Sequence, residues 1–256
     1  MYQNLHMHTY RCHHASGTEE EYVLKAIDAG MTAIGFADHC PLFRSFHGDN
    51  EDLHWFRMDM EELPGYVETI AGLRDKYRDV IDIRIGLEGE YYPSIHKDLM
   101  RAYKDAGVEY LGLAGHMLWE GELESGWPKR PVTPDDLTEY VNTLLKGAAT
   151  GDFLFVAHPD LIRYPVEDEF YLSEMTRLIK GMRELDIPLE INLAGLQGGR
   201  HYPKESFWKT VGEYGNRVIF NSDAHSPAAV WDRPTYDRAM EWVEKYSLNY
   251  QPRILY

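Results

Sequence analysis

Cysteine is nearly absent from this 256-residue sequence, which contains only Cys12 and Cys40. Two cysteines cannot form the disulfide framework of a small secreted domain, so they favour a reducing compartment. No apolar stretch is long enough to span a bilayer, and the N-terminus lacks the basic flank, apolar run and cleavage site of a signal peptide. We therefore expect a cytoplasmic protein with no membrane partner.

Basic residues are also scarce, because 26 Lys and Arg stand against 42 Asp and Glu, a formal net charge of -16. Proteins that bind nucleic acid regardless of its sequence hold the phosphate backbone with an excess of Lys and Arg. The charge balance therefore argues against a nucleic-acid partner. Bound cations would neutralise part of the negative charge. The sequence leaves the oligomeric state open.

No internal repeat, low-complexity run or Pro/Gly-rich linker divides the chain, so we expect one domain over residues 1–256. Apolar β-type runs alternate with helical patterns throughout, which is typical of an α/β protein with parallel strands. Seven strands are predicted, at residues 2–7, 32–37, 81–87, 110–115, 153–157, 188–193 and 218–221. Thr18 with Glu21, and Thr133 with Pro134, predict helix starts, and residues 61–77 form an amphipathic pattern. The alternation alone fits a barrel or an open sheet.

Histidines and carboxylates gather where the predicted strands end. They are His6, His8, Asp38, His39, Glu88, His116, His158, Asp223 and His225. In a parallel α/β protein these positions share the carboxyl edge of the sheet, where such folds place active sites. Because side chains alternate along a strand, the imidazoles of His6 and His8 share one face and can reach one metal ion. Nitrogen and oxygen donors from six strand ends suit Zn²⁺, Mn²⁺ or Fe²⁺ better than Ca²⁺.

A single histidine at a strand end is more often a surface or hydrogen-bonded side chain than a ligand, so the prediction depends on the joint pattern. His13 and His14 are adjacent, and only one is expected to point inward. Glu88 and Glu90 share a face of the strand, and we favour Glu88, at the end of the apolar run, as the bridging ligand. The other histidines and cysteines are expected to have roles outside the metal site, which is the commoner case for such residues. They are His47, His54, His96, His201, Cys12 and Cys40.

Seven short motifs carry the candidate ligands. They are His6-x-His8, Cys12-x-His14, Asp38-His39, Gly86-Leu87-Glu88, Gly115-His116, Ala157-His158-Pro159-Asp160 and Ser222-Asp223-Ala224-His225. Over nearly the whole chain this set resembles the polymerase and histidinol phosphatase (PHP) superfamily. The segments at residues 58–63, 86–92, 158–163 and 189–195 look like its histidinol-phosphatase branch.

The resemblance implies a distorted (β/α)7 barrel with three divalent transition metals, Zn, Mn or Fe, at the carboxyl ends of parallel strands. One metal would take His6, His8, Glu88 and Asp223, a second Glu88, His116 and His158, and a third His14, His39 and His225. By position, the resemblance selects His14 over His13. The implied activity is that of a phosphoric monoester hydrolase converting L-histidinol phosphate and water to L-histidinol and phosphate, a step of histidine biosynthesis.

Clustered cations suit phosphate monoester hydrolysis, because its transition state spreads negative charge over the phosphoryl oxygens. They would also lower the pKa of a bound water and align the resulting hydroxide for attack on phosphorus. In chain order, Arg163 and Arg200 are the basic residues best placed to contact the phosphate. Asp160 and His225 are the candidates for protonating the leaving alkoxide.

The cationic organic part of such a substrate would favour acidic and aromatic walls. Residues 43–58, with His47, Asp49, Asn50, Glu51, Asp52 and Trp55, could supply a lid or be an ordinary solvated loop. Trp119, Glu120 and Trp127 form a second candidate wall. Two alternative functions stand beside this one: hydrolysis of another small phosphate or a nucleotide, and metal-stabilised binding without turnover.

Overall fold

The computed structural model describes residues 3–48 and 50–254, and its centre is a sheet in the order β1-β2-β3-β4-β7-β8-β9-β10. Every pairing in this sheet is parallel. The strands are β1 Gln3–Asn4, β2 Ala33–His39, β3 Asp82–Gly89, β4 Tyr110–Leu113, β7 Phe155–Val156, β8 Leu189–Asn192, β9 Arg217–Asn221 and β10 Asn249–Tyr250. The seven predicted strands are therefore present in their predicted order.

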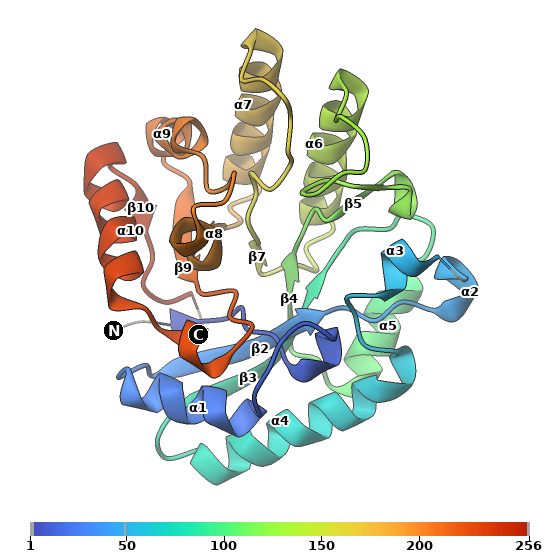
Figure 1. Cartoon of the computed structure of the whole chain (residues 1–256), viewed down its shortest axis with the longest axis vertical. Helices are drawn as coiled ribbons and strands as arrows, with labels where there is room; N and C mark the ends of the chain where they lie inside the picture. The colour runs from blue at the N-terminus through green and yellow to red at the C-terminus, as the bar shows by residue number, and fades with distance from the viewer. Residues whose placement is uncertain (1–2, 49, 255–256) are drawn as a thin grey trace.

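Contacts between the two ends of the chain close this sheet into a distorted barrel. A parallel bridge joins Met7 to Ala224 directly after β1 and β9, and the His8 N–H donates to the Ala224 carbonyl at 2.9 Å. The Asn4 amide donates to Ser222 Oγ at 2.6 Å. The longer helices surround the strands on the outside (Figure 1). The predicted α/β barrel is thus confirmed.

Two of the helices between the strands begin at the capping residues that the sequence predicts. Thr18 with Glu21, and Thr133 with Asp136, form capping boxes at the starts of α1 and α6. The α-helices are α1 Glu19–Asp28, α2 Arg44–His47, α3 Glu51–His54, α4 Leu63–Tyr77, α5 His96–Ala106, α6 Pro134–Ala149, α7 Glu169–Glu184, α8 Leu193–Gly198, α9 Glu205–Tyr214 and α10 Arg233–Tyr246. Among the helices in the described part of the chain, none combines the length and hydropathy needed to cross a membrane.

Several short elements were not predicted. An antiparallel hairpin of β5 Met117–Leu118 and β6 Leu123–Glu124 follows β4, and β10 pairs with the start of β9. Short 3-10 helices occur at η1 Tyr10–Cys12, η2 Met60–Glu62, η3 Trp119–Gly121 and η4 Pro227–Val230. The strands β5, β6 and β10 lie outside any longer apolar run or alternation, so pattern analysis passes over them.

The interior of the barrel is filled by a small apolar cluster around Tyr110. Its hydroxyl donates to the carbonyls of Leu5 at 2.8 Å and Phe36 at 3.2 Å. A Cβ added at Gly35 or Gly86 would lie 2.1 or 2.2 Å from atoms of the Tyr110 side chain, so these two strand positions must be glycine to admit the ring. This plug lies below the carboxyl ends of the strands and leaves those ends open.

Candidate metal centre

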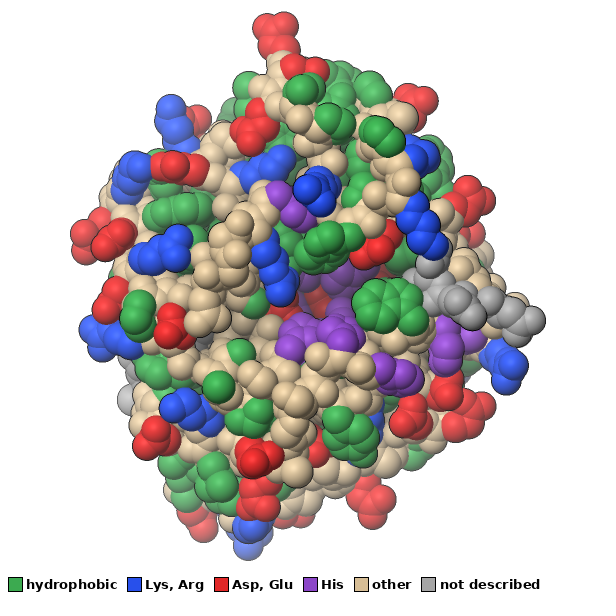
Figure 2. Space-filling model, viewed as in Figure 1, with side chains coloured by type: hydrophobic (Ala, Val, Ile, Leu, Met, Phe, Trp, Pro, Cys, Tyr) green, Lys and Arg blue, Asp and Glu red, His purple; other side chains and the backbone are tan. Residues whose placement is uncertain are grey.

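The carboxyl ends of the barrel strands surround a pocket of about 720 Å³. Figure 2 shows histidine side chains gathered in a hollow at the centre of this face of the molecule. Seven of the nine predicted metal ligands line the pocket, namely His14, His39, Glu88, His116, His158, Asp223 and His225. His6 and His8 lie beneath them and are completely buried.

His6 and His8 converge on two carboxylates from opposite sides of the barrel. His8 Nε2 lies 3.0 Å from Asp223 Oδ1 and 3.6 Å from Glu88 Oε2. His6 Nε2 lies 3.3 Å from Glu88 Oε1 and 3.6 Å from Asp223 Oδ1. The two Nε2 atoms are 3.2 Å apart. The geometry thus brings together the four residues expected to hold one metal.

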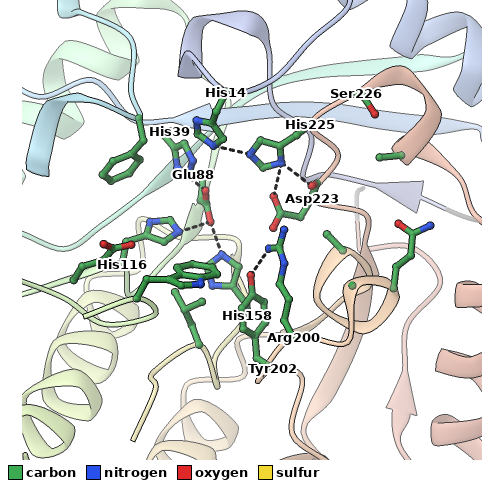
Figure 3. A pocket seen from close by; sticks show the side chains of 18 of the residues that line it. His14, His39, Glu88, His116, His158, Arg200, Tyr202, Asp223, His225 and Ser226 are labelled. Carbon is green, nitrogen blue, oxygen red and sulfur yellow. Dashed lines mark hydrogen bonds and ion pairs between the residues drawn. The ribbon is translucent and has the colours of Figure 1, made fainter. Parts of the chain in front are cut away.

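Glu88 also lies between further imidazoles (Figure 3). Its Oε1 atom is 2.7 Å from His158 Nε2 and 3.3 Å from His116 Nε2. Its Oε2 atom is 2.9 Å from His39 Nδ1. A carboxylate surrounded in this way is placed to bridge ions, the role predicted for Glu88. Glu90 lies behind His116, and its carboxylate pairs with the buried Arg57 guanidinium.

The third predicted group brings together residues from both ends of the chain. His14 Nε2 and His225 Nε2 are 3.0 Å apart, and the two rings stack at a centroid distance of 4.6 Å. The ring of His39 stacks on His14 at 5.5 Å. His13 takes a left-handed conformation with φ 68° at the end of η1, and its side chain is exposed. It lies outside the pocket lining, whereas His14 is part of it.

The hydrogen bonds of these rings direct two nitrogen lone pairs toward a common point. His14 Nδ1 donates to the Cys12 carbonyl at 2.6 Å, and His225 Nδ1 donates to the Asp223 carbonyl at 3.0 Å. Because a carbonyl can only accept, each neutral ring carries its lone pair on Nε2, and the two lone pairs point at one another. Only a cation between them, a proton or a metal ion, makes this contact favourable. The donor set therefore fits a metal.

Two buried ligand atoms support the same conclusion. Glu88 Oε2 and His39 Nδ1 lie close together, yet neither makes an aligned hydrogen bond within the described residues. Buried polar atoms without partners are costly, and ions bound in the pocket would remove this cost for both atoms. At and beneath the pocket, several sets of three His, Cys, Asp or Glu donor atoms lie within 4.8 Å of one another.

Carboxylates behind the predicted ligands orient the imidazoles. Glu190 Oε2 lies 2.9 Å from His6 Nδ1, and Asp38 Oδ1 lies 3.4 Å from His8 Nδ1. Asn192 donates to Asp223 Oδ2 at 3.0 Å. Such contacts fix the tautomer and direction of a metal-binding ring. Sequence reasoning missed Glu190, although it occupies a predicted strand that ends without a histidine.

The charges of the site depress the carboxyl pKa values. Burial alone would raise the pKa of Glu88, but the imidazoles of His116 and His6 outweigh burial and hold it well below its usual range. Burial alone would lower the pKa of His6, but Glu190 and Glu88 raise it well above its ordinary value. Burial and the charge on His8 lower the pKa of His225 to about 4. The metal-free site therefore holds ionised carboxylates beside protonated and neutral rings.

Two predicted ligands occupy unusual backbone conformations. His158 has φ 29° and Asp223 has φ 49°, in the left-handed region that disfavours side chains with a Cβ. Such residues cost on the order of 1–3 kcal/mol each and concentrate at functional sites. The rest of the fold therefore stabilises these turns, at the ends of β7 and β9, against an unfavourable local backbone conformation.

The predicted catalytic residues occupy different surroundings. Arg200 lines the pocket, and its Nη1 donates to the Tyr202 hydroxyl at 2.7 Å. Arg163 is exposed and lies outside the pocket lining. Asp160 also lies outside the lining. It is completely buried, accepts from the Lys204 backbone N–H, and burial raises its pKa to about 6.

Aromatic and acidic side chains form the walls of the pocket. Trp55 and Phe56, which we call the entrance wall, come from the predicted lid segment and line one side. Trp127 lines the pocket as predicted, whereas Trp119 and Glu120 do not belong to the lining. Residue 49 and the side chains of residues 51 and 52 lie outside the described part of the structure. The lining residues that sequence reasoning missed include Glu124 on β6 and Tyr202 after α8.

The remaining histidines lie away from the predicted ligands. His47 and His54 stack on each other at 5.4 Å, and His96 pairs with Asp152 at 2.7 Å. His201 Nε2 donates to the Leu161 carbonyl at 2.7 Å. None of the four lines the pocket, in keeping with their expected roles outside the metal site.

The fold and site together define an α/β-barrel protein with a histidine- and carboxylate-rich candidate metal centre at the strand ends. Residues 4–194 match the family model of the PHP domain. The chain therefore belongs to the PHP domain family.

Individual relatives agree with this assignment. The chain is 29% identical to the "Probable histidinol-phosphatase" of Deinococcus radiodurans, over 88% of this chain and 86% of the relative. It is 35% identical to the "Histidinol-phosphatase" of Bacillus subtilis, over 37% of this chain and 35% of the relative. Among solved structures, histidinol phosphate phosphatase from Lactococcus lactis, complexed with Zn, L-histidinol and phosphate, has a TM-score of 0.74 at 18% identity. That match covers 97% of this chain and 95% of the other and establishes the common fold.

Proposed function

We propose that this chain is a metal-dependent phosphomonoester hydrolase whose substrate is L-histidinol phosphate, which it converts with water to L-histidinol and phosphate. The observation that carries the proposal is the convergence of nine nitrogen and oxygen donors, from six strand ends, on a pocket that also holds Arg200. The names of the relatives and the ligands of the Lactococcus lactis protein support histidinol phosphate as the substrate. Strands from both ends of the chain build the pocket, which supports one domain over residues 1–256.

Three ions, Zn, Mn or Fe, would be held by three groups of ligands. These are His6, His8, Glu88 and Asp223; Glu88, His116 and His158; and His14, His39 and His225. When bound, such ions supply charge stabilisation of the phosphoryl oxygens and lower the pKa of a coordinated water. Donor distances of 2.7 to 3.6 Å within the first two groups, and the 3.0 Å between His14 Nε2 and His225 Nε2, support this division. His39 joins the third group because the family resemblance implies it.

Arg200 is the residue of this chain best placed to bind the phosphate. Its guanidinium donates to the Tyr202 hydroxyl and lies 5.8 Å from the centre of the Trp127 ring. These contacts restrict the direction of a long side chain before the substrate arrives. A planar guanidinium then offers parallel N–H donors to two phosphate oxygens.

Asp160 is the better of the two candidates for protonating the leaving alkoxide. His225 donates through Nδ1 to the Asp223 carbonyl, and its Nε2 is assigned to a metal, so the one proton of the ring is held by the backbone and does not face the substrate. Burial raises the pKa of Asp160 to about 6, which leaves part of this carboxyl protonated near neutral pH. Because Asp160 lies behind the pocket lining, its proton would pass through a neighbouring group.

The organic part of the substrate would contact the walls opposite the metal ligands. Glu124 provides a carboxylate for the ammonium group of histidinol phosphate. Trp127 and the entrance wall provide ring faces on which an imidazole can stack. These groups would distinguish histidinol phosphate from phosphomonoesters that lack a cationic group.

The test is phosphate release by the purified chain after chelation and reloading with Zn²⁺ or Mn²⁺. Chelation should abolish turnover and reloading should restore it. The value of kcat/KM for histidinol phosphate should exceed that for an aryl phosphate by at least ~100-fold, because buried polar groups discriminate strongly against substrates that leave them unpaired. Equal kcat/KM values for the two substrates would be consistent with a phosphoesterase but would reject histidinol phosphate as its specific substrate. No hydrolysis by the metal-loaded chain would reject both.

A further inference from the structure

A buried ion pair lies directly behind His116. Arg57 is only 1% exposed, and its Nη1 and Nη2 donate to Glu90 Oε2 and Oε1 at 2.9 and 3.1 Å. Two parallel charge-assisted hydrogen bonds hold both groups in fixed directions. The pair lies between the last residues of β3 and the segment that follows α3.

Glu90 also contacts the imidazole of His116, because its Oε1 atom lies 2.9 Å from His116 Nδ1. An ionised carboxylate only accepts hydrogen bonds, so Nδ1 carries the proton and the lone pair of the neutral ring is on Nε2. That Nε2 atom is 3.3 Å from Glu88 Oε1. Glu90 therefore determines both the tautomer and the direction of a predicted metal ligand.

Arg57 connects this ligand to the entrance wall. Its Nε donates to the Leu53 carbonyl at the end of α3, and its Nη1 donates to the Cys40 carbonyl after β2 at 3.1 Å. The guanidinium lies 4.1 Å from the centre of the Phe56 ring. Phe56 meets His39 edge to face at a centroid distance of 4.8 Å. One side chain thus links α3, the ends of β2 and β3, and the pocket.

Stability alone does not account for this arrangement. Removing two charges from water is costly, and replacing a buried ion pair with apolar residues is often neutral or stabilising. What an apolar pair could not provide is an acceptor aimed at His116 Nδ1. The specific contribution of the pair therefore lies in its contact with the metal ligand.

We infer that Glu90 is a positioning residue which, held by Arg57, fixes the His116 imidazole for metal binding and couples that ligand to the entrance wall. The inference rests on the proposed metal centre and not on the identity of the substrate. Glu90 reaches the reacting atoms only through His116.

The experiment is a metal titration of the double variant Arg57→Met/Glu90→Leu, in competition with a chromophoric chelator. Removing both members avoids leaving one buried charge unpaired, and the metal-free variant should keep an unfolding temperature close to that of the wild type. The affinity for one ion should fall by about 10–100-fold, the usual effect of losing a group that orients a ligand, while the other ions bind as before. In the single variant Glu90→Gln, the amide oxygen can still accept from Nδ1, so the loss should be smaller.

The matched control is Asp136→Asn. Asp136 is also a buried carboxylate gripped by an arginine, since Arg130 Nη2 donates to its Oδ1 at 2.9 Å. Within the described residues its side chain bonds to Trp119, Arg130 and Thr133 and to none of the predicted ligands, so every ion should bind this variant as it binds the wild type. Unchanged affinities in the double variant, or an equal fall for all ions, would overturn the inference. Metal binding without histidinol phosphate turnover would reject the proposed substrate and leave the inference intact.

Discussion

His14 and His225 face each other through Nε2 atoms 3.0 Å apart, although 211 residues separate them in the chain. The other nitrogen of each ring donates to a backbone carbonyl only two residues away. Local structure thus turns two lone pairs toward a common point, and the closure of the barrel brings the two turns together. A proton can occupy this point in the metal-free protein, so metal ions must compete with protons for the site.

Metal loading should therefore depend on pH. The charges of Glu88 and Glu90 outweigh burial and raise the pKa of His116 to about 10, so the metal-free ring is protonated at neutral pH. That proton must leave when a metal binds. If one proton is displaced, the apparent affinity for the metal should therefore fall about tenfold each time the pH drops by one unit below 10. Chelator competition at pH 6 and pH 8 measures this dependence.

The same titrations count the ions. Nine donor residues exceed the needs of one four- to six-coordinate ion, so we expect more than one transition metal per chain. A single ion at full occupancy would contradict the three-ion assignment. A pH-independent affinity would contradict the proposed protonation of the metal-free site.

Neutralising either of two carboxylates that we assign to the metals should abolish most of the activity. Glu88→Gln and Asp223→Asn each remove a negative charge that holds the metals together, and turnover should fall by several orders of magnitude with the fold retained. Steady-state phosphate release and circular dichroism check the two parts of this prediction. His13→Ala is the control, because His13 lies outside the pocket lining. Equal losses in His13→Ala and His14→Ala would show that the third metal is assigned to the wrong histidine.

Replacing Arg200 should reduce catalysis much more than replacing Arg163. Arg200→Ala should lower kcat/KM for every phosphomonoester alike by roughly 10–150-fold, the equivalent of losing a charge-assisted hydrogen bond of about 1.5–3 kcal/mol. Arg163→Ala should have a much smaller effect, because this side chain is exposed and lies outside the pocket lining. Kinetics on two unrelated phosphomonoesters separate these outcomes. A comparable loss in both variants would mean that the segment carrying Arg163 reaches the substrate.

Substrate selection should depend on Glu124. Glu124→Gln keeps the size of the side chain and removes its charge, so kcat/KM for histidinol phosphate should fall by about tenfold or more while the value for an aryl phosphate changes little. The ratio of the two values is the measurement. An unchanged ratio would place recognition of the ammonium group at another wall of the pocket.

The proton donor can be identified from the pH dependence of kcat. If Asp160 supplies the proton, turnover of the wild type should decline as the pH rises above about 6, because burial raises the pKa of this carboxyl to that value and its acid form is lost there. Asp160→Asn should lower kcat and remove this decline. A variant with the wild-type profile would exclude Asp160 as the acid.

The order of strands and the set of candidate ligands could be predicted from the sequence because both depend on local patterns. Apolar runs mark the strands, and the residue that follows each run necessarily lies at the carboxyl edge of a parallel sheet. That reasoning found His6, His116 and His158 without knowledge of which strands are neighbours. The choice of His14 over His13 needed the family resemblance, because adjacent residues in a turn have no periodicity to separate them.

Tertiary structure decided what depends on packing between distant segments. Periodicity places Glu88 and Glu90 on one face, but β3 ends at Gly89, and Glu90 turns toward Arg57, 33 residues earlier in the chain. The pattern likewise could not show that Arg200 lines the pocket while Arg163 remains exposed. The alternation of side chains predicts directions only within a regular strand or helix. Beyond the strand ends, burial and long-range hydrogen bonds determine where each group points.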